Sequence, residues 1–348
     1  MRGYWRRTRG AQLADAFLVG TLLTHAPITA QSVLQRAPDV PGTAVLWSEP
    51  TDIATRTLFD GPGGRAHAPH GTTFRFVKED LGGSNPKFIV RDDAGTMWTL
   101  KLGWEAQPET AASRIVWAVG YVADDDYYLP HLCVEGLPAK VHRGRRLFDG
   151  HGCTGGGRLK RHEKDEDDAT TTAWRWRENP FTGTREFNGL RVLMAVINNW
   201  DVKDINNRRR TTTDPHGDRV QVFWVSDLGA SFGTTHLTLG HSGTRGNLAA
   251  YRESPFIRKT TACCVDFAVP AHAAPIVLFN PAQYHMRVGL RWIGQNIPRD
   301  DARWMGELLG RLSANQIGDA FRAAGYSDED SEAFTAILEQ RIDLLRSL

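Results

Sequence analysis

The chain has 348 residues, of which 41% are hydrophobic and 24% are charged, a balance that is ordinary for a globular protein. A chain of this length can bury a substantial core, either in one two-lobed domain or in two smaller domains. The formal net charge of only +2 argues against a protein that binds nucleic acid mainly through its charge, so no nucleic-acid partner is expected.

The first 30 residues have the pattern of a signal peptide. A short apolar run, Ala16 to Leu23, follows a basic start and precedes small residues that suit a cleavage site, Pro27 to Ala30. The run is too short to span a bilayer comfortably, and no later stretch reaches that length. We therefore expect an exported, periplasmic or extracellular protein without a membrane span, or a cytoplasmic one if this segment is only an extension. The basic start consists of Arg2, Arg6, Arg7 and Arg9.

The four cysteines are compatible with an oxidising compartment. Cys133 and Cys153 could form a disulfide if the chain is exported, although four unpaired buried thiols remain an equally good interpretation. Cys263 and Cys264 are adjacent, and we do not expect them to pair with each other. No C-x-x-C spacing occurs, so the cysteines predict no zinc site.

The first half of the chain is rich in strand patterns. Residues 31–71 contain much Pro, Gly and Ala and suggest a loosely structured lead-in. Three stretches separated by tight turns then predict a three-stranded antiparallel sheet, and 127–132 predicts another short strand. A helix should begin near Pro108, with Glu109 in its first turn. We place the first lobe at residues 72–135. The three stretches are Thr72–Glu79, Lys87–Arg91 and Thr96–Leu102.

Residues 136–348 are expected to form a second, mainly helical lobe. The polar stretch 143–173 predicts a long loop or insertion, and its acidic run Asp165–Asp168 suits a solvated loop better than a cation site. A buried helix over 187–198 precedes a hairpin with the return strand Val220–Val225. Strands followed by helices predict an α+β fold with two lobes, a small antiparallel-sheet N-lobe and a helical C-lobe. The last helices are expected over 302–312, 314–324 and 328–348, the final one capped by Ser327.

Three polar residues on two loops carry the strongest chemical signal. Asp201 follows the buried helix, Asn206 comes five residues later, and Asp227 ends the hairpin strand. Phosphoryl transfer needs a held triphosphate, a divalent metal and an oriented acceptor hydroxyl. Asp201 could orient the acceptor, Asn206 and Asp227 could bind the metal, and Gly229 lets the backbone turn away sharply. Asp204 lies on the same loop and is a second candidate for the base.

The segment from Asn199 to Asn206 resembles the catalytic loop of kinases, and Asp227-Leu228-Gly229 resembles their metal-binding segment. Because Asn-Trp stands where His-Arg is usual, the resemblance is closer to the atypical kinases, which include HipA-like, phosphoinositide-kinase-like and secretory-pathway kinases. It covers roughly residues 72–235. It implies a two-lobed kinase-like fold that uses ATP with Mg²⁺ or Mn²⁺. It also implies Asp201 as catalytic base or acceptor-orienting group, and Asn206 and Asp227 as metal ligands.

The same resemblance gives roles to residues farther upstream. Kinases hold the α- and β-phosphates with a Lys on the third strand, which a helix Glu orients. Lys101 lies on that strand and Glu109 opens the next helix, with Glu105 as the rival. The turn Gly82-Gly83-Ser84 lies where a phosphate-covering loop belongs, so its backbone amides could contact the nucleotide. This turn is not a G-x-G-x-x-G, and no Ala-Pro-Glu segment follows Asp227, which leaves the substrate class open.

Other motifs carry weaker signals. Gly229–Gly233 matches G-x-S-x-G, but the nucleophile elbow of hydrolases needs a helix straight after its serine, and the next residues do not predict one. His236 and His241 could line an acceptor site, although solvated loop positions explain them better. Trp174–Arg177 suggests a strand or a lid over the core rather than a stacking platform. Arg208–Arg210 suggests the exposed tip of a hairpin rather than an anion site.

Together these features predict an ATP- and divalent-metal-dependent phosphotransferase. Its acceptor could be a hydroxyl of a protein, a lipid or a sugar, and the sequence does not choose among them. Two alternatives on the same fold stay open: a catalytically inactive, pseudokinase-like binding module, and an enzyme that transfers the nucleotidyl group to protein. An exported protein would meet little ATP, which is the argument for the binding module.

Overall fold

The computed structural model describes residues 43–162, 171–214, 216–234, 244–268 and 281–348. All of them belong to one compact unit, Pro38–Leu348. The predicted signal peptide at 1–30, the acidic run at 165–168, and His236 and His241 lie outside the described residues. Among the helices of the described part, none is long and apolar enough to cross a membrane.

A seven-stranded sheet forms the first lobe, in the order β5-β8-β4-β3-β2-β6-β7. Its centre is the predicted antiparallel meander β2-β3-β4, in which Lys87 lies directly opposite Lys101. Only the β2–β6 pair is parallel among the pairs of this sheet. The strands are β2 (Thr73–Asp80), β3 (Lys87–Arg91), β4 (Met97–Lys101), β5 (Asp126–Leu129), β6 (Leu132–Glu135), β7 (Cys153–Thr154) and β8 (Gly157–Arg161).

Helix α1 (Ala106–Ala118) follows β4, as the sequence predicted, and packs against β5 and β8. The sheet has an apolar core of its own, in which Phe88 and Trp98 are fully buried. A second and larger core lies among the helices that follow. Two separate cores, one under a sheet and one among helices, confirm the predicted two-lobed α+β fold.

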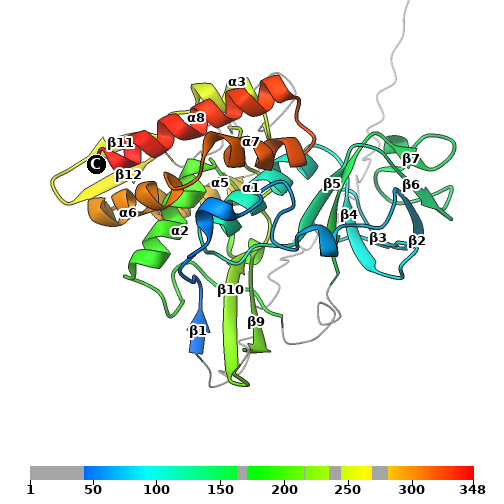
Figure 1. The fold of residues 1–348 in the computed structure, drawn as a ribbon, viewed down its shortest axis with the longest axis horizontal. Helices are drawn as coiled ribbons and strands as arrows, with labels where there is room; N and C mark the ends of the chain where they lie inside the picture. Colours follow the sequence, from blue (N-terminus) through cyan, green and yellow to red (C-terminus); the bar gives the residue numbers. More distant parts are fainter. Residues whose placement is uncertain (1–42, 163–170, 215, 235–243, 269–280) are drawn as a thin grey trace, which may run out of the picture. The chain divides into compact units, whose positions relative to one another are not determined.

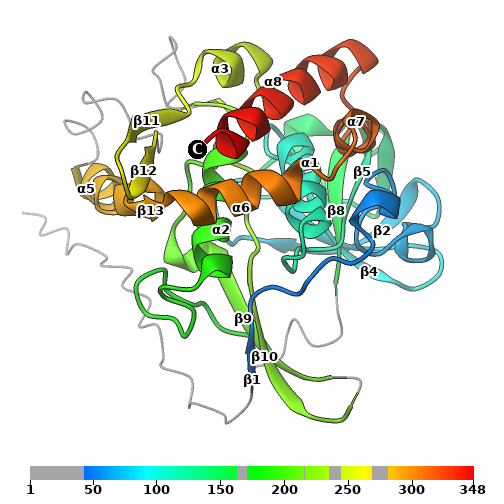
Figure 2. The same cartoon turned by 60° about the vertical axis from the view of Figure 1, so that its left-hand side comes forward.

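The second lobe combines helices with two small sheets. The predicted hairpin of β9 (Asn207–Thr213) and β10 (Arg219–Val225) gains a third strand, β1 (Thr43–Val45), which runs parallel to β10; Figure 2 shows the three side by side. The other sheet consists of β11 (Ile257–Thr260), β12 (Cys264–Phe267) and β13 (Ile297–Pro298).

The helices of this lobe begin with α2 (Arg185–Val196), whose cap is the Thr184 side chain. The C-terminal helices α6, α7 and α8 pack together, α8 against both of the others (Figure 1). Ser327 caps α8, as the sequence predicted, by accepting from the backbone N–H of Asp330. After α2, the described residues form the helices α3 (Leu248–Glu253), α5 (Pro281–Gly289), α6 (Arg299–Leu309), α7 (Ala314–Ala323) and α8 (Asp328–Arg346). Five short 3-10 helices are Ile53–Thr55, Arg65–His67, Arg145–Leu147, Asp204–Asn206 and Arg291–Gly294.

Two expectations about loops are wrong. The stretch 143–173 is not one long loop, because it supplies β7 and β8, and β8 pairs with both β4 and β5. The predicted limit of the first lobe at residue 135 therefore cuts its sheet. The lead-in is structured from Thr43 onward, since Ile53 and Leu58 are buried in the helical core. Both places contain glycines, which suggested loops. Their short apolar stretches are structured only because they pack against segments that are distant in the chain.

The cysteines decide one open alternative and overturn one expectation. Cys133 and Cys153 lie opposite each other on β6 and β7 and form a disulfide. Cys263 and Cys264 also form a disulfide, contrary to the prediction that neighbours would not pair. They lie where the chain turns from β11 into β12, and the Thr261 hydroxyl contacts Cys263 Sγ and the backbone of Cys264.

Candidate active site

A cleft of about 670 Å³ lies between the sheet of the first lobe and the hairpin β9-β10. Ile89 and Lys101 line it from the sheet, and Val222 and Asp227 line it from β10 and its end. The segment 122–124, which joins α1 to β5, lines it as well. The volume falls within the usual range of small-molecule sites.

Lys101 is the centre of a buried cluster of charges. It is the last residue of β4, and its side chain reaches Glu109 on α1. Its Nζ lies 2.8 Å from Glu105 Oε2, 2.8 Å from Glu109 Oε2 and 3.2 Å from Asp227 Oδ1. The structure thus brings together the three predicted residues Lys101, Glu109 and Asp227, and it includes the rival Glu105 as well.

Glu105 and Glu109 differ in what else they bind. Glu109 also contacts Arg158 on β8, with Oε1 at 3.2 Å from Nη2, and Arg158 continues to Asp126 Oδ1 at 3.1 Å. Glu105 instead contacts Arg245, with Oε1 at 2.7 Å from Nε. Four residues apart, the two glutamates lie on one side of the first helical turn, so both reach the same lysine.

Burial and neighbouring charge set the ionisation of this cluster. Burial opposes the charge on Asp227, but the nearby Lys101 ammonium outweighs it and lowers the pKa of Asp227 to about 2. The pKa of Lys101 is raised, because its carboxylate partners outweigh its burial. At Glu109 the effect of burial is larger than that of the nearby Arg158 and Lys101, which favour the ionised carboxylate, so the pKa of Glu109 is raised. Burial also raises the pKa of Asp126 to about 7, against the attraction of Arg158.

Asp227 is held where its strand ends. The backbone N–H of Gly229 donates to Asp227 Oδ1 at 3.3 Å. Gly229 also lets the segment approach α1, because a Cβ there would lie 2.6 Å from Glu105 Cβ. The Asp227 side chain is 42% exposed, so its carboxylate is accessible from the cleft that it lines.

The loop that carries Asp201 begins where α2 ends. Asn198 follows the helix in the left-handed conformation, with φ of 52°, which asparagine tolerates better than most residues. Asn199 Oδ1 accepts from Asp201 N at 3.0 Å, and Asn206 Nδ2 donates to the carbonyl oxygen of Asp201. The backbone N–H of Asp227 donates to Asn206 O at 3.3 Å. The two predicted metal-binding loops therefore lie against each other.

The Asp201 carboxylate has two cationic partners. Lys203 Nζ lies 3.0 Å from Oδ2, and Arg287 Nη2 on α5 lies 3.0 Å from Oδ1. The rival Asp204 contacts a different part of the lobe, since its Oδ1 accepts from the backbone N–H of Trp176 at 3.1 Å. Burial raises the pKa of Asp204. None of Asp201, Asp204 and Asn206 is among the described residues that line the cleft, and the two aspartates differ in their partners.

The predicted phosphate-covering turn lies outside the lining of the cleft. Among the described residues, Asp80 and Leu81 line it, whereas Gly82, Gly83 and Ser84 do not. Gly82 N donates to Asp80 Oδ1 at 2.8 Å, and Gly83 has a φ of 68°, which glycine adopts without strain. This geometry belongs to a tight hairpin turn, so no contact of these amides with a nucleotide follows from it.

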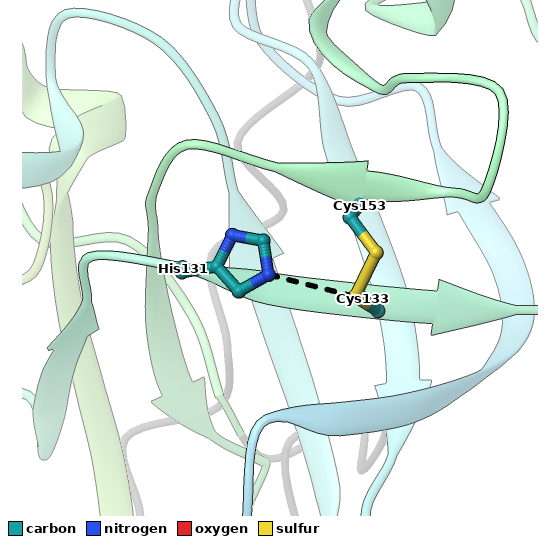
Figure 3. A group of neighbouring side chains, drawn as sticks. All are labelled: His131, Cys133 and Cys153. Carbon is teal, nitrogen blue, oxygen red and sulfur yellow. Dashed lines mark hydrogen bonds between the residues drawn. A yellow bond between two sulfur atoms is a disulfide. The ribbon is translucent and has the colours of Figure 1, made fainter.

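Candidate oxygen ligands for a divalent metal lie on two loops. Asn206 donates its Nδ2 to Asp201, which leaves its Oδ1 as the atom able to bind a cation, and Asp227 offers a carboxylate. Such a donor set suits Mg²⁺ or Mn²⁺. His131, Cys133 and Cys153 also lie within 4.8 Å of one another, but the disulfide occupies both sulfurs (Figure 3). They are therefore not metal ligands in this state.

The structure also places the weaker sequence motifs. Trp174 and Trp176 are buried against each other, with ring centroids 5.0 Å apart, and belong to the core. Arg208 and Arg210 lie on β9 and line the cleft, so they are not the tip of the hairpin as predicted. The G-x-S-x-G serine, Ser231, is buried and no helix follows it within the residues described up to 234.

Several contributors to the site were not anticipated from the sequence. Arg158, Arg245 and Arg287 each contact a carboxylate of the site from a distant segment. Asp124 ties the connecting segment to β10, where it accepts from Trp224 Nε1 at 2.9 Å and from Ser226 Oγ at 2.6 Å. The one local signal for any of them was the position of Arg158 inside the strand Gly157–Arg161, because a charged residue buried in a strand needs a partner.

Comparison with solved structures finds similarity to kinases over most of the chain. The Helicobacter pylori proinflammatory kinase CtkA covers 79% of this chain and 96% of its own, with 11% identity and a TM-score of 0.42. Golgi casein kinase covers 80% of this chain and 73% of its own, with 9% identity and a TM-score of 0.34. Golgi casein kinase with Mn/ADP bound covers 78% and 73%, with 11% identity and a TM-score of 0.31. No protein-family model and no curated protein matches the sequence. The similarity to these kinases is one of fold alone.

Proposed function

We propose that this protein is an ATP- and divalent-metal-dependent phosphotransferase that acts on a hydroxyl group. The observation that supports it best is the buried Lys101, which contacts Glu109 on α1 and Asp227 at the wall of the cleft. A buried cation that joins a sheet, a helix and a metal-ligand candidate is the arrangement that phosphate binding in a kinase-like cleft requires.

Each residue then has a part in the reaction. Lys101 binds the phosphates of the nucleotide, and Glu109, itself anchored by Arg158, keeps that lysine in place. Asn206 and Asp227 hold the divalent metal, which neutralises phosphate charge when it is bound. Asp201 orients the acceptor hydroxyl, and its two cationic partners hold the carboxylate in place. Because phosphoryl transfer has a loose transition state, such positioning supplies most of the catalysis.

The test separates this function from its rivals with labelled ATP. Thermal unfolding should shift upward with ATP and Mn²⁺ together, and label from γ-labelled ATP should reach a protein, lipid or sugar acceptor. Label transferred only from α-labelled ATP would indicate nucleotidyl transfer. Nucleotide binding without any transfer, or no binding at all, would favour a binding module.

Asp201→Asn sharpens the same test. The variant should still show the Mn²⁺-dependent shift, because its side chain is placed at the acceptor rather than at the nucleotide, but it should lose transfer from γ-labelled ATP. Asp218→Asn is the matched control, since Asp218 is exposed in the segment that joins β9 to β10. Equal transfer by wild type and the Asp201 variant would contradict the role given to Asp201.

A further inference from the structure

Two arginines from separate segments lie against the ring of Trp200, the residue directly before Asp201. The guanidinium carbon of Arg245 lies 4.7 Å from the ring centroid, and that of Arg287 lies 4.8 Å from it. Arg245 precedes α3, and Arg287 belongs to α5. Trp200 is buried, so these cation–π contacts act with little screening by water.

Each arginine also contacts a carboxylate of the candidate site. Arg245 Nε lies 2.7 Å from Glu105 Oε1, and Glu105 Oε2 lies 2.8 Å from Lys101 Nζ. Arg287 Nη2 lies 3.0 Å from Asp201 Oδ1. A continuous series of contacts thus runs from Lys101 in the sheet to Asp201 in the helical lobe, with Trp200 at its middle.

The backbone fixes the middle of this series. Arg287 Nη1 donates to Trp200 O at 2.9 Å, and Trp200 Nε1 donates to Thr244 O at 3.1 Å. The backbone N–H of Trp200 donates to Ala230 O at 3.2 Å, which ties it to the segment after Asp227. Trp200 is therefore held by three segments at once, and a shift in any of them would displace Asp201.

We propose that Arg245 and Arg287 are positioning residues that fix Asp201 relative to Lys101, Arg245 through Trp200 and Arg287 through its contacts with both Trp200 and Asp201. The proposal rests on the phosphotransferase function and goes beyond it, because neither arginine is assigned to nucleotide, metal or acceptor. Arg245 is the informative member, since its contacts are with Glu105 and Trp200, whereas Arg287 contacts Asp201 directly. An effect of Arg245 on catalysis would thus have to pass through its neighbours.

The experiment compares Arg245→Met with Arg177→Met, which removes a similar arginine lying 4.5 Å from Trp292, outside the site. Steady-state turnover of Mn-ATP and Mn-ATP affinity by calorimetry are measured for both. Arg245→Met should lower kcat by about tenfold to hundredfold, the cost of a small misplacement of a reacting group, while KM and Mn-ATP affinity change little. Arg177→Met should leave kcat unchanged.

Glu105→Gln provides a second arm. It should lower kcat like Arg245→Met, and the double variant should be no slower than the slower single variant, because both interrupt one series of contacts. Arg245→Lys keeps the charge opposite Glu105 but loses the planar stacking on Trp200, so it should recover part of kcat. It also replaces Arg245→Met in the comparison if the Met variant does not fold.

The outcomes are distinguishable. Wild-type turnover with an unchanged kcat in every folded Arg245 variant would overturn the positioning role and leave the proposed function intact. A loss of Mn-ATP affinity equal to the loss of kcat would also overturn it, because Arg245 would then act on nucleotide binding. Absence of nucleotide binding and transfer in the wild type would remove the proposed function and this inference with it.

Discussion

The two charged centres of the candidate site, one around Lys101 and one around Asp201, are held in different ways. Around Lys101, the side chains of Lys101, Glu105 and Glu109 are only 5%, 8% and 3% exposed, and Arg158 closes the far side. Around Asp201, the carboxylate is 19% exposed and its partner Lys203 is 27% exposed, whereas its other partner Arg287 is only 6% exposed. The first centre is an interior ion cluster, and the second faces water on one side.

This difference has an energetic consequence. A charge removed from water needs its partners, so the loss of one member of an interior cluster leaves the others uncompensated. A pair that water reaches is screened and loses little when one member is removed. The Lys101 centre should therefore couple folding to function, whereas the Asp201 centre should affect function with less effect on folding.

Lys101→Met should have the largest effect. It leaves buried Glu105 and Glu109 without their shared cation, so the free energy of unfolding should fall by about 3–5 kcal/mol and Mn-ATP turnover should be lost. Urea unfolding and turnover assays measure the two effects.

Lys87→Met is a close control, because Lys87 lies opposite Lys101 on β3 and pairs with Asp80 at 3.0 Å. These partners are 23% and 32% exposed, so that variant should cost only about 0–1 kcal/mol. Equal losses in both variants would contradict the distinction between the two kinds of ion pair.

Asp227→Asn should remove the metal-dependent part of nucleotide binding. In the wild type, Mn-ATP at 100 times its Kd should stabilise the fold by about 2.7 kcal/mol, measured by thermal unfolding. The variant should lose most of this gain, because an amide is a weaker ligand for a divalent metal than a carboxylate. Asp218→Asn should keep it. A full Mn²⁺-dependent shift in Asp227→Asn would exclude this residue as a metal ligand.

The sheet around Lys101 could be predicted because its signals are local. Two short stretches rich in strand-forming residues, Lys87–Arg91 and Met97–Lys101, with a turn between them, indicate a hairpin within about 15 residues. Lys101 then follows from its place in the third strand. The sequence left Glu105 and Glu109 as rivals for this lysine, whereas in the structure both contact it.

The remaining parts depend on contacts between distant segments, which no local pattern contains. β8 inserts between β4 and β5 although it follows both in the chain. Arg287 reaches Asp201 from 86 residues away, and α5 shows no feature that marks this arginine among its neighbours. Arg208 and Arg210 look like a hairpin tip until the register places them within β9. Long-range pairing, rather than residue type, decided these positions.

Gly229→Ala tests how closely the segment after Asp227 approaches Glu105. The new Cβ would lie 2.6 Å from Glu105 Cβ and 3.0 Å from its Cγ, so Glu105 or the loop must move. We expect a loss of about 1–3 kcal/mol in urea unfolding, typical of overpacking, together with a fall in kcat. Gly150→Ala is the control, because nothing lies within 4 Å of a Cβ there. Equal stability of the two variants would indicate that the approach of Glu105 is not tight.

The smallest expected effect is a pH dependence that comes from the interior centre alone. Asp126 faces Arg158 at 3.1 Å, with Glu109, Asp124 and Lys160 nearby, and its Oδ2 is buried with no hydrogen-bond partner among the described residues. Its pKa of about 7 lies above the value of an unfolded aspartate. Between those values the folded state binds more protons than the unfolded state, so stability must fall as the pH rises toward 7.

Urea unfolding of wild type and Asp126→Asn between pH 5 and pH 8 isolates this contribution, since every other titrating group is shared. The wild type should lose stability up to pH 7 with a slope of at most about 1.4 kcal/mol per pH unit from this residue, and the variant should show a flatter profile. Glu109, whose pKa is also raised, keeps part of the slope in both proteins. Asp227 acts in the opposite sense, but its pKa of about 2 confines that effect to more acidic solutions. Asp93→Asn, in an exposed turn, should reproduce the wild-type profile. Parallel profiles for wild type and Asp126→Asn would mean that the interior cluster keeps Asp126 ionised, and that Arg158 compensates it more strongly than burial penalises it.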